Sequence, residues 1–327
     1  MTAQAARAPI NTPRMWIGIA VSVLCIVLVS RRVNWTSFVS ALASVSPAWL
    51  GGAAVLTAAG YVCAGMRWRQ VIEPEAVLTP REAYDFVVIS NLATLVAPSR
   101  AGDLAKAALV SQRTSTPISR VLGAIVVERF GDVVMLILLA AALSIAVRFP
   151  PLIQAGVMAF VAAGVATIAA IVLAADRLPA IAGRVVGWIA PSWGSRIRDF
   201  LAGIFSGIRS VGGFHRFLGT LAWSFAGWAF AGLAMWCTIR AFALPVPWYA
   251  AFFVLLVINL GGVIPASPGS IGVYHYLAVS ALAVWMVDAN VALGFAVVAH
   301  AAGIVVITVL GLAGLASQHQ SLFRVTA

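Results

Sequence analysis

The stretch that most constrains the fold runs from Asn259 to Tyr276 and reads NLGGVIPASPGSIGVYHY. It lies inside a strongly apolar part of the chain, yet it contains Pro265, Pro268 and four glycines. Proline removes a helical hydrogen bond and glycine weakens a helix, so we expect a membrane-spanning helix to be interrupted here. Interrupted backbone at membrane depth is tolerated only where protein buries it or where it lines a wet cavity. The stretch is therefore the first candidate for a binding site.

The second half of this stretch is expected to contact a ligand. A helix that opens after PGSIG would present free backbone N–H groups, which attract anions. A histidine follows and could bind phosphate, although a lone histidine among aromatic residues is more often a hydrogen-bonded core residue. Gly269 is expected to be the hardest glycine to replace, because backbone has to approach a partner there. The candidate ligand-binding residues are Ser267, Gly269, Ser270, Gly272 and His275.

A fainter version of the pattern reads NLATLVAPSRAGDLAKA. Both segments run through Asn-Leu, a proline, a serine and a glycine before a helix-like run. Interrupted hydrophobic segments at corresponding positions in two halves of a chain point to a transporter-type binding site between inverted repeats. The alternative is two unrelated proline kinks. The residues predicted to form the breaks are Asn91, Pro98 and Gly102 in the first segment and Asn259, Pro265 and Pro268 in the second.

Composition places the chain in a membrane. Hydrophobic residues make up 62% of the 327 residues and charged residues only 9%, whereas a soluble domain has about 25% charged residues. The net charge of +11 comes mostly from arginine, and no basic segment lies outside the membrane pattern, which argues against nucleic-acid binding. The three cysteines stand singly, so no disulfide, metal site or cofactor is expected.

Arginine-rich and charge-poor stretches alternate along the chain and predict its topology. The stretches 67–81, 112–120 and 176–216 read as cytoplasmic loops or surface, and the loops near 150 and 245 as external. Both termini then lie in the cytoplasm of a cell with a bacterial-type cytoplasmic (inner) membrane. If the broken segments instead cross the membrane completely, each loop still lies on the same side of the membrane.

The predicted fold is an all-α polytopic integral membrane protein with six or more transmembrane helices and two re-entrant broken-helix hairpins in an inverted repeat. The expected parts are a tail at 1–14, a single transmembrane domain at 15–316 and a tail at 317–327. The domain contains the broken segments 82–110 and 248–287 and an amphipathic surface section at 176–216.

Charged residues inside an apolar span are costly, which makes them functional candidates. Glu128 and Asp132 lie one helical turn apart in an apolar run, and Arg129 can reach Asp132 at i,i+3 and serve as the counter-charge of both acids. The alternative is a structural ion pair that holds two helices together. A second group would share one helical face beside the first break, or form a charged face at the membrane surface: Arg100, Asp103 and Lys106.

Three runs together resemble one known family. They are PSRAGDLAK from Pro98 to Lys106, ERFGD from Glu128 to Asp132, and PGSIGVYH from Pro268 to His275. In order and spacing they are similar to the lysylphosphatidylglycerol synthase transmembrane family, a flippase-like domain, over roughly residues 15–316. The resemblance implies a lipid flippase with inverted repeats and re-entrant helices. Many relatives carry an acid where this chain has His275, and no aminoacyl-transferase domain is expected, so neither a cationic headgroup nor an aminoacylated lipid is implied.

The expected function is movement of an amphiphilic, phosphate-containing lipid with an anionic or zwitterionic headgroup between leaflets. A polar groove between the broken segments would shelter the headgroup while the acyl chains stay in lipid. Three cations would attract phosphate, and three acids would hold those cations or bind a cationic headgroup or a proton. The cations are Arg100, Lys106 and Arg129, and the acids are Asp103, Glu128 and Asp132.

The sequence favours enzymatic and solute-transport functions less than movement of a lipid. The chain has no HExxH, Walker A, GxSxG or CxxC pattern and no residue that resembles an activated nucleophile, so it is not expected to be an enzyme. Two alternatives stay open: a secondary transporter of a small solute, and a membrane enzyme or accessory protein of lipid biosynthesis. The expected protein partner is a second copy of the chain or a lipid-synthesis enzyme.

Overall fold

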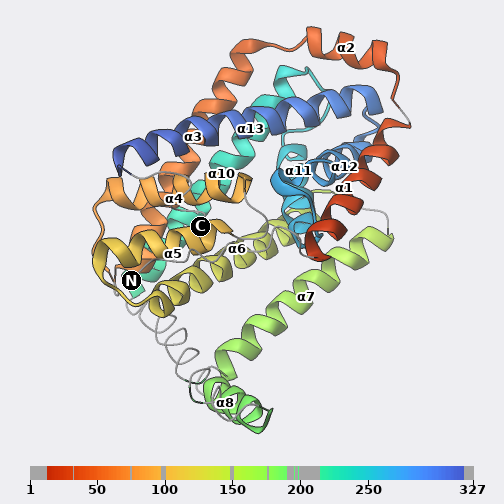
Figure 1. The fold of residues 1–327 in the computed structure, drawn as a ribbon. Helices are drawn as coiled ribbons and strands as arrows, with labels where there is room; N and C mark the ends of the chain where they lie inside the picture. The colour runs from red at the N-terminus through yellow and green to blue at the C-terminus, as the bar shows by residue number, and fades with distance from the viewer. Residues whose placement is uncertain are drawn as a thin grey trace. The chain divides into compact units, whose positions relative to one another are not determined.

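The computed structural model describes residues 13–31, 33–73, 76–96, 101–147, 151–174, 177–189, 195, 198 and 214–319 (Figure 1). These residues form helices joined by turns, with no strand among them. The α-helices are α1 (Pro13–Ser30), α2 (Trp35–Ala43), α3 (Pro47–Ile72), α4 (Pro80–Val96), α5 (Ala101–Thr114), α6 (Ile118–Ala146), α7 (Pro151–Ala174), α8 (Leu178–Ile189), α10 (Phe214–Ala241), α11 (Ala250–Leu260), α12 (Val273–Leu282) and α13 (Ala289–Ser317). Short 3₁₀ segments are η1 (Gly261–Val263), η2 (Pro268–Ser270) and η3 (Ala283–Trp285).

Among the described residues, three helices are long and apolar enough to cross a membrane: α3, the Leu218–Ala241 part of α10, and α13. The α1 and α2 helices would make a fourth span if they count as one, with a bend of 92° between them. The part of the chain that the structure describes is thus an all-helical integral membrane protein. The number of six or more spans, the re-entrant hairpins and the inverted repeat stay predictions.

The chain divides into two compact units. The first unit comprises Met1–Cys63, Asp85–Ala105 and Ala226–Ala327, and the second comprises Ala64–Tyr84 and Lys106–Phe225. In the first unit, α12 packs against α1, α11 and α13, and α13 also packs against α2 (Figure 1). In the second unit, α6 packs against α7.

The apolar helix of the first unit is interrupted in the stretch where the sequence predicts a break. The α11 helix ends at Leu260 and α12 begins at Val273, and only two short 3₁₀ turns lie between them. The backbone of this stretch needs glycine, because Gly269 has φ +68° and Gly272 has φ +90°. Ser270, between them, also has a positive φ of +55°. The interruption therefore follows from the local sequence.

Helix α1 covers the second break. A methyl group at Gly18 would lie 2.6 Å from the carbonyl oxygen of Ala266, so the α1 backbone directly contacts the irregular segment. Ser22 Oγ accepts a hydrogen bond from Ser267 N at 2.9 Å and donates to Ser267 Oγ at 3.1 Å. These contacts satisfy backbone that lacks helical partners. The second break thus contacts α1 through Ala266 and Ser267, whereas Pro265 and Pro268 are exposed.

At Gly272, next to the break, a methyl group would overlap the carbonyl oxygen of Ser22. At Gly269 the nearest atom to such a methyl would be Leu95 Cδ1, at 3.4 Å. The expectation that Gly269 is the hardest glycine to replace is therefore wrong, because the close backbone contact lies at Gly272.

The first break lies between α4 and α5, and Pro98 and Arg100 fall outside the described residues. On either side of it the two helices are in close contact, since Ser90 Oγ donates to the carbonyl oxygen of Gly102 at 2.8 Å. A side chain at Gly102 would overlap the Ser90 carbonyl, so close packing of α4 and α5 requires glycine there.

The two asparagines of the repeated pattern have the same local role. Asn91 Nδ2 donates to the carbonyl oxygen of Val87 at 2.9 Å, and Asn259 Nδ2 donates to that of Leu255 at 2.8 Å. Each therefore donates to a carbonyl inside its own helix, four residues earlier in the chain.

In the second unit, α3 is longer than the sequence suggests. The stretch 67–81 was predicted to be a positive loop, but α3 continues to Ile72 and includes Arg67 and Arg69. The prediction is wrong because charge alone does not end a helix, and no proline or glycine occurs between Arg67 and Ile72. Arg69 Nε donates to the carbonyl oxygen of Leu78 at 3.0 Å, which joins the end of α3 to the segment before α4.

The predicted amphipathic section 176–216 is described only in part. Its first portion forms α8, on which Ile181, Val185 and Trp188 are exposed. Exposed apolar residues on a helix that also carries Arg184 fit a helix at a membrane surface. Most of the remainder lies outside the described residues, and the cytoplasmic side stays a prediction.

Candidate functional site

Three helices of the second unit bring four charged side chains together. The end of α3 supplies Arg67, α5 supplies Lys106, and α6 supplies Glu128 and Asp132. We call these four residues the ion-pair cluster. Arg67, Lys106 and Glu128 are all buried in helices that are otherwise largely apolar.

Arg67 is the centre of this cluster. Its Nη2 lies 3.0 Å from Glu128 Oε1 and its Nη1 lies 2.6 Å from Asp132 Oδ1. The planar guanidinium presents donors in a fixed fork, which matches two carboxylates that lie one helical turn apart. A lysine at this position could not hold both acids with the same geometry.

Lys106 completes the partners of Glu128. Its ammonium group forms a hydrogen-bonded ion pair with Glu128 Oε2, so each oxygen of Glu128 accepts from a different cation. The same Nζ atom lies 4.1 Å from the centre of the Trp68 ring, within the range of a cation–π interaction. A carboxylate and an aromatic face together compensate for the burial of the only lysine in the chain.

Arg129 lies at the edge of the cluster. Its Nη1 is 3.1 Å from Asp132 Oδ2, which confirms the i,i+3 contact predicted from sequence. Its side chain is 49% exposed, whereas that of Arg67 is only 10% exposed. Arg129 is therefore the most exposed of the three cations that contact the two acids.

The sequence identifies only part of the counter-charge of the acids. Arg129 pairs with Asp132 as predicted, but the structure adds Arg67 on both acids and Lys106 on Glu128. Sequence reasoning missed Arg67 and Trp68 because both were placed in or next to a loop. The available signal was an uninterrupted helical run from Met66 to Ile72 that would keep an arginine inside the apolar span.

The predicted residues of the second break lie in the first unit. His275 Nδ1 accepts a hydrogen bond from Gly272 N at 3.2 Å, so the imidazole caps the start of α12. The His300 ring lies 5.1 Å from that of His275, stacks on Tyr274 at 4.3 Å, and is hydrogen-bonded to the backbone of Gly269. The two histidines therefore support the shape of the break, and contact of His275 with a substrate stays a prediction.

The serines of this break bond mainly to nearby backbone. Ser267 Oγ donates to the carbonyl oxygen of Ile271 at 3.2 Å, and Ser270 N donates to that of Ser267 at 2.8 Å. In the first segment, Asp103 lies half-buried in the first turn of α5. A binding role for these residues stays a prediction.

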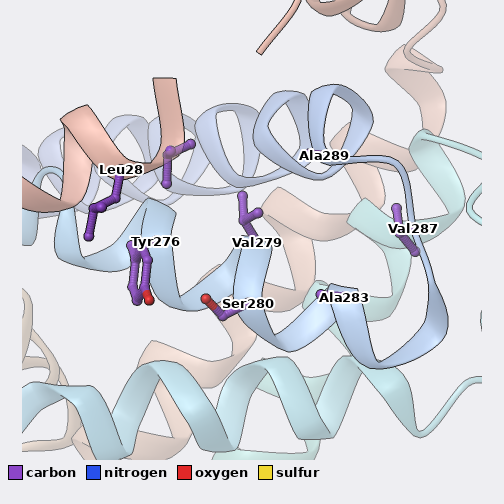
Figure 2. A pocket seen from close by; sticks show the side chains of 8 residues that line it. Leu28, Tyr276, Val279, Ser280, Ala283, Val287 and Ala289 are labelled. Atoms are coloured by element: carbon purple, nitrogen blue, oxygen red, sulfur yellow. The ribbon is translucent and has the colours of Figure 1, made fainter. Parts of the chain in front are cut away.

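A cavity of about 280 Å³ lies beside α12 in the first unit (Figure 2). Its lining is mostly apolar and includes Leu28 of α1 and Val279 of α12. Tyr276 and Ser280, one turn apart on α12, add two hydroxyl groups on the same side of the helix (Figure 2). The cavity thus combines a mostly apolar lining with two hydroxyl groups.

The fold and the ion-pair cluster define the class of protein: a helical integral membrane protein that buries charge within its helices. The chain belongs to the lysylphosphatidylglycerol synthase transmembrane-region family, whose pattern matches residues 15–311. It is also 25% identical to the Glycosyltransferase AglD of Haloferax volcanii over 342 aligned positions, which cover 93% of this chain and 54% of that protein. The chain thus spans about half the length of this curated relative. No solved structure matches the chain.

Proposed function

We propose that this protein moves a phosphate-containing lipid between the two leaflets of a bacterial-type cytoplasmic membrane. The observation that carries the proposal is the ion-pair cluster, in which three of the four charged side chains are buried and Asp132 is part-buried. Burial of charge in a membrane protein is costly, and apolar side chains would hold the same helices together as well or better. Membership of a family named for a lipid-modifying synthase supports a lipid as substrate.

The charges suggest how a headgroup would be received. Arg129 is the half-exposed cation beside the cluster, so a phosphate would contact it first. Arg100 would add a second cation next to the first break. Asp103 would face the cationic end of a zwitterionic headgroup. Arg67 and Lys106 hold Glu128 and Asp132 in place. They would contact the phosphate only if those ion pairs broke.

Two features of the first unit support a path for the lipid. Gly269 lies against Leu95, since a methyl at Gly269 would be 3.4 Å from Leu95 Cδ1, which brings the second break close to the end of α4. This proximity supports an inverted repeat in which two re-entrant segments meet. The mostly apolar cavity beside α12 would accept part of an acyl chain.

The proposal is tested with purified protein in liposomes that contain a headgroup-labelled phospholipid. A reagent that destroys only the outer-leaflet label measures exchange between leaflets. We expect exchange well above that of protein-free liposomes, and we expect Arg129→Gln to abolish it. Arg113→Gln is the matched control, because Arg113 is an exposed arginine of the same unit whose partner is Glu82 at 2.6 Å. Wild-type protein that gives no exchange above background with any phospholipid contradicts the proposal.

A second candidate function comes from the relative in Haloferax volcanii, whose name describes a glycosyltransferase. A membrane enzyme of lipid glycosylation would yield a new lipid product when membranes are supplied with sugar donors. A secondary transporter would instead accumulate a solute in the same liposomes. Extracted lipids and solute uptake are therefore measured on the preparation used for leaflet exchange.

A further inference from the structure

Five buried polar atoms of the second unit have no hydrogen-bond partner among the described residues. They are Arg67 Nε, Trp68 Nε1, Gln70 Oε1, Thr220 Oγ1 and Ser224 Oγ. We call these five side chains the polar seam. Three of them belong to residues that are more than nine-tenths buried, namely Arg67, Trp68 and Ser224. Buried polar groups normally have partners, so a set of five in one region requires an explanation.

The seam residues lie on two helices that contact each other. Arg67 and Gln70 lie one turn apart on α3, and Thr220 and Ser224 lie one turn apart on α10. The two helices meet where the Gln70 amide lies against Gly219, since a methyl at Gly219 would be 2.6 Å from Gln70 Oε1. On the α6 side, a methyl at Gly131 would be 4.0 Å from Ser224 Oγ. The seam thus runs along α3 and α10 and reaches the ion-pair cluster through Arg67.

The two hydroxyls on α10 are oriented differently from most others in the chain. A helical serine or threonine can satisfy its hydroxyl by donating to the carbonyl four residues earlier. Thr57, Thr94, Thr114 and Thr238 all do so, at 2.8 to 3.1 Å. Thr220 and Ser224 have the same option and do not use it. Their hydroxyls therefore lie where none of the described residues supplies a hydrogen-bond partner.

The types of atom define that partner. Arg67 Nε and Trp68 Nε1 can only donate, Gln70 Oε1 can only accept, and the two hydroxyls can do either. An anion would satisfy the donors but repel the amide oxygen and the neighbouring carboxylates. A cation would satisfy the amide oxygen but would leave the donors Arg67 Nε and Trp68 Nε1 without an acceptor. A hydroxyl group both donates and accepts and carries no charge, so it is the chemical class that fits all five atoms.

We propose that the polar seam is a binding site for hydroxyl groups, supplied either by water or by the headgroup of a polyol lipid. A hydroxyl bound to Arg67 Nε would stabilise the guanidinium that holds Glu128 and Asp132. This site does not depend on the proposed lipid transport, because it is defined only by the five buried atoms and their hydrogen-bonding capacity.

Thermal stability of two variants tests the site. Thr220→Val and Ser224→Ala each remove a hydroxyl with little change of shape. If the hydroxyl is bonded, its loss lowers Tm by about 2–4 °C per hydrogen bond, on the scale of a domain of 150–250 residues. If it has no partner, removal of an unsatisfied polar group leaves Tm unchanged or raises it. Thr238→Val on the same helix is the matched control, because Thr238 is buried and its hydroxyl donates to Ala234 at 3.1 Å.

Two conditions separate the sources of the hydroxyl. The first uses an amine-oxide detergent, which has no hydroxyl, so that only water can fill the seam. The second adds phosphatidylinositol. A loss of Tm in both conditions assigns the seam to water, and a loss that occurs only with phosphatidylinositol assigns it to the lipid. An unchanged or raised Tm of both variants in both conditions overturns the proposal.

A measurement on the wild-type protein covers the case in which the variants do not fold. X-ray radiolysis of bound water or hydroxyls produces radicals that oxidise adjacent side chains even when bulk solvent is excluded. Trp68 is 0% exposed and lies in the seam, whereas Phe295 is 0% exposed and lies in the other unit. We expect oxidation of Trp68 and not of Phe295. Protection of Trp68 equal to that of Phe295 contradicts a hydroxyl at the seam.

Discussion

Arg67 Nη1 lies 2.6 Å from Asp132 Oδ1, although the two residues are 65 positions apart in the chain. The contact joins the end of α3 to α6, and the same guanidinium also holds Glu128. Arg67 therefore stabilises two acids that would otherwise be buried close to each other without sufficient compensation. The relationship identifies Arg67 as the residue on which the ion-pair cluster depends.

Replacement of Arg67 by Gln is expected to destabilise the protein by about 3–5 kcal/mol, the usual cost of breaking a buried ion pair. Arg67→Lys is expected to recover only part of this loss, because lysine lacks the fork that reaches both acids. Thermal unfolding of the purified variants measures both effects. The exposed Arg113→Gln control is expected to cost less than about 1 kcal/mol. Equal effects at the two positions would contradict the assignment.

Arg129→Gln is expected to leave the fold intact and to lower lipid exchange by at least about tenfold, or about 1.4 kcal/mol. The reason is that Arg129 is half-exposed and its loss leaves Arg67 and Lys106 on the acids. Leaflet exchange and Tm are measured on the same preparation. Normal exchange would remove Arg129 from the path of the headgroup. Loss of folding would instead favour a structural role.

Gly272→Ala is expected to destabilise the protein more than Gly269→Ala. Both residues have positive φ, which costs any other residue about 1–2 kcal/mol. At Gly272 the added methyl would also overlap the Ser22 carbonyl, whereas at Gly269 it would meet only Leu95 Cδ1 at 3.4 Å. Thermal unfolding ranks the two variants. The opposite ranking would contradict the close contact between Gly272 and the Ser22 carbonyl of α1.

A cysteine at Ser195, in a chain with Cys25, Cys63 and Cys237 replaced by alanine, tests the topology. The arginine-rich section 176–216 is expected to face the cytoplasm, because positive loops are retained there. An impermeant thiol reagent should then leave intact cells unlabelled and should label opened cells. Labelling of intact cells would reverse the predicted orientation.

Cysteines at Ala101 and Ser270 in the same background test the proximity of the two breaks. Gly269 already lies against Leu95, near the end of α4, so the segments that follow are expected to be close. Oxidation should form an intramolecular crosslink, visible as a shift in electrophoresis that a reducing agent reverses. The control pairs Ala101 with a cysteine at Met286, which lies beyond α12. Failure of the first pair to crosslink would count against the inverted repeat.

The sequence by itself determined the features that depend on neighbouring residues or on overall composition. Low charge and long apolar runs place the chain in a membrane. Pro265, Pro268 and the glycines around them interrupt the helix after Leu260, because they act on backbone hydrogen bonds of their own segment. The Arg129–Asp132 contact was predictable for the same reason, since helical geometry alone places residues three apart on one face.

Only the tertiary structure decided which partners meet across helices. The uninterrupted run after Met66 can keep Arg67 in a helix, but the sequence does not indicate that its partners are Glu128 and Asp132 on α6. The same holds for Lys106 over the Trp68 ring and for the α1 backbone against Gly272. These contacts depend on how helices distant in the chain pack, and helical periodicity fixes the face of each helix but not its neighbour.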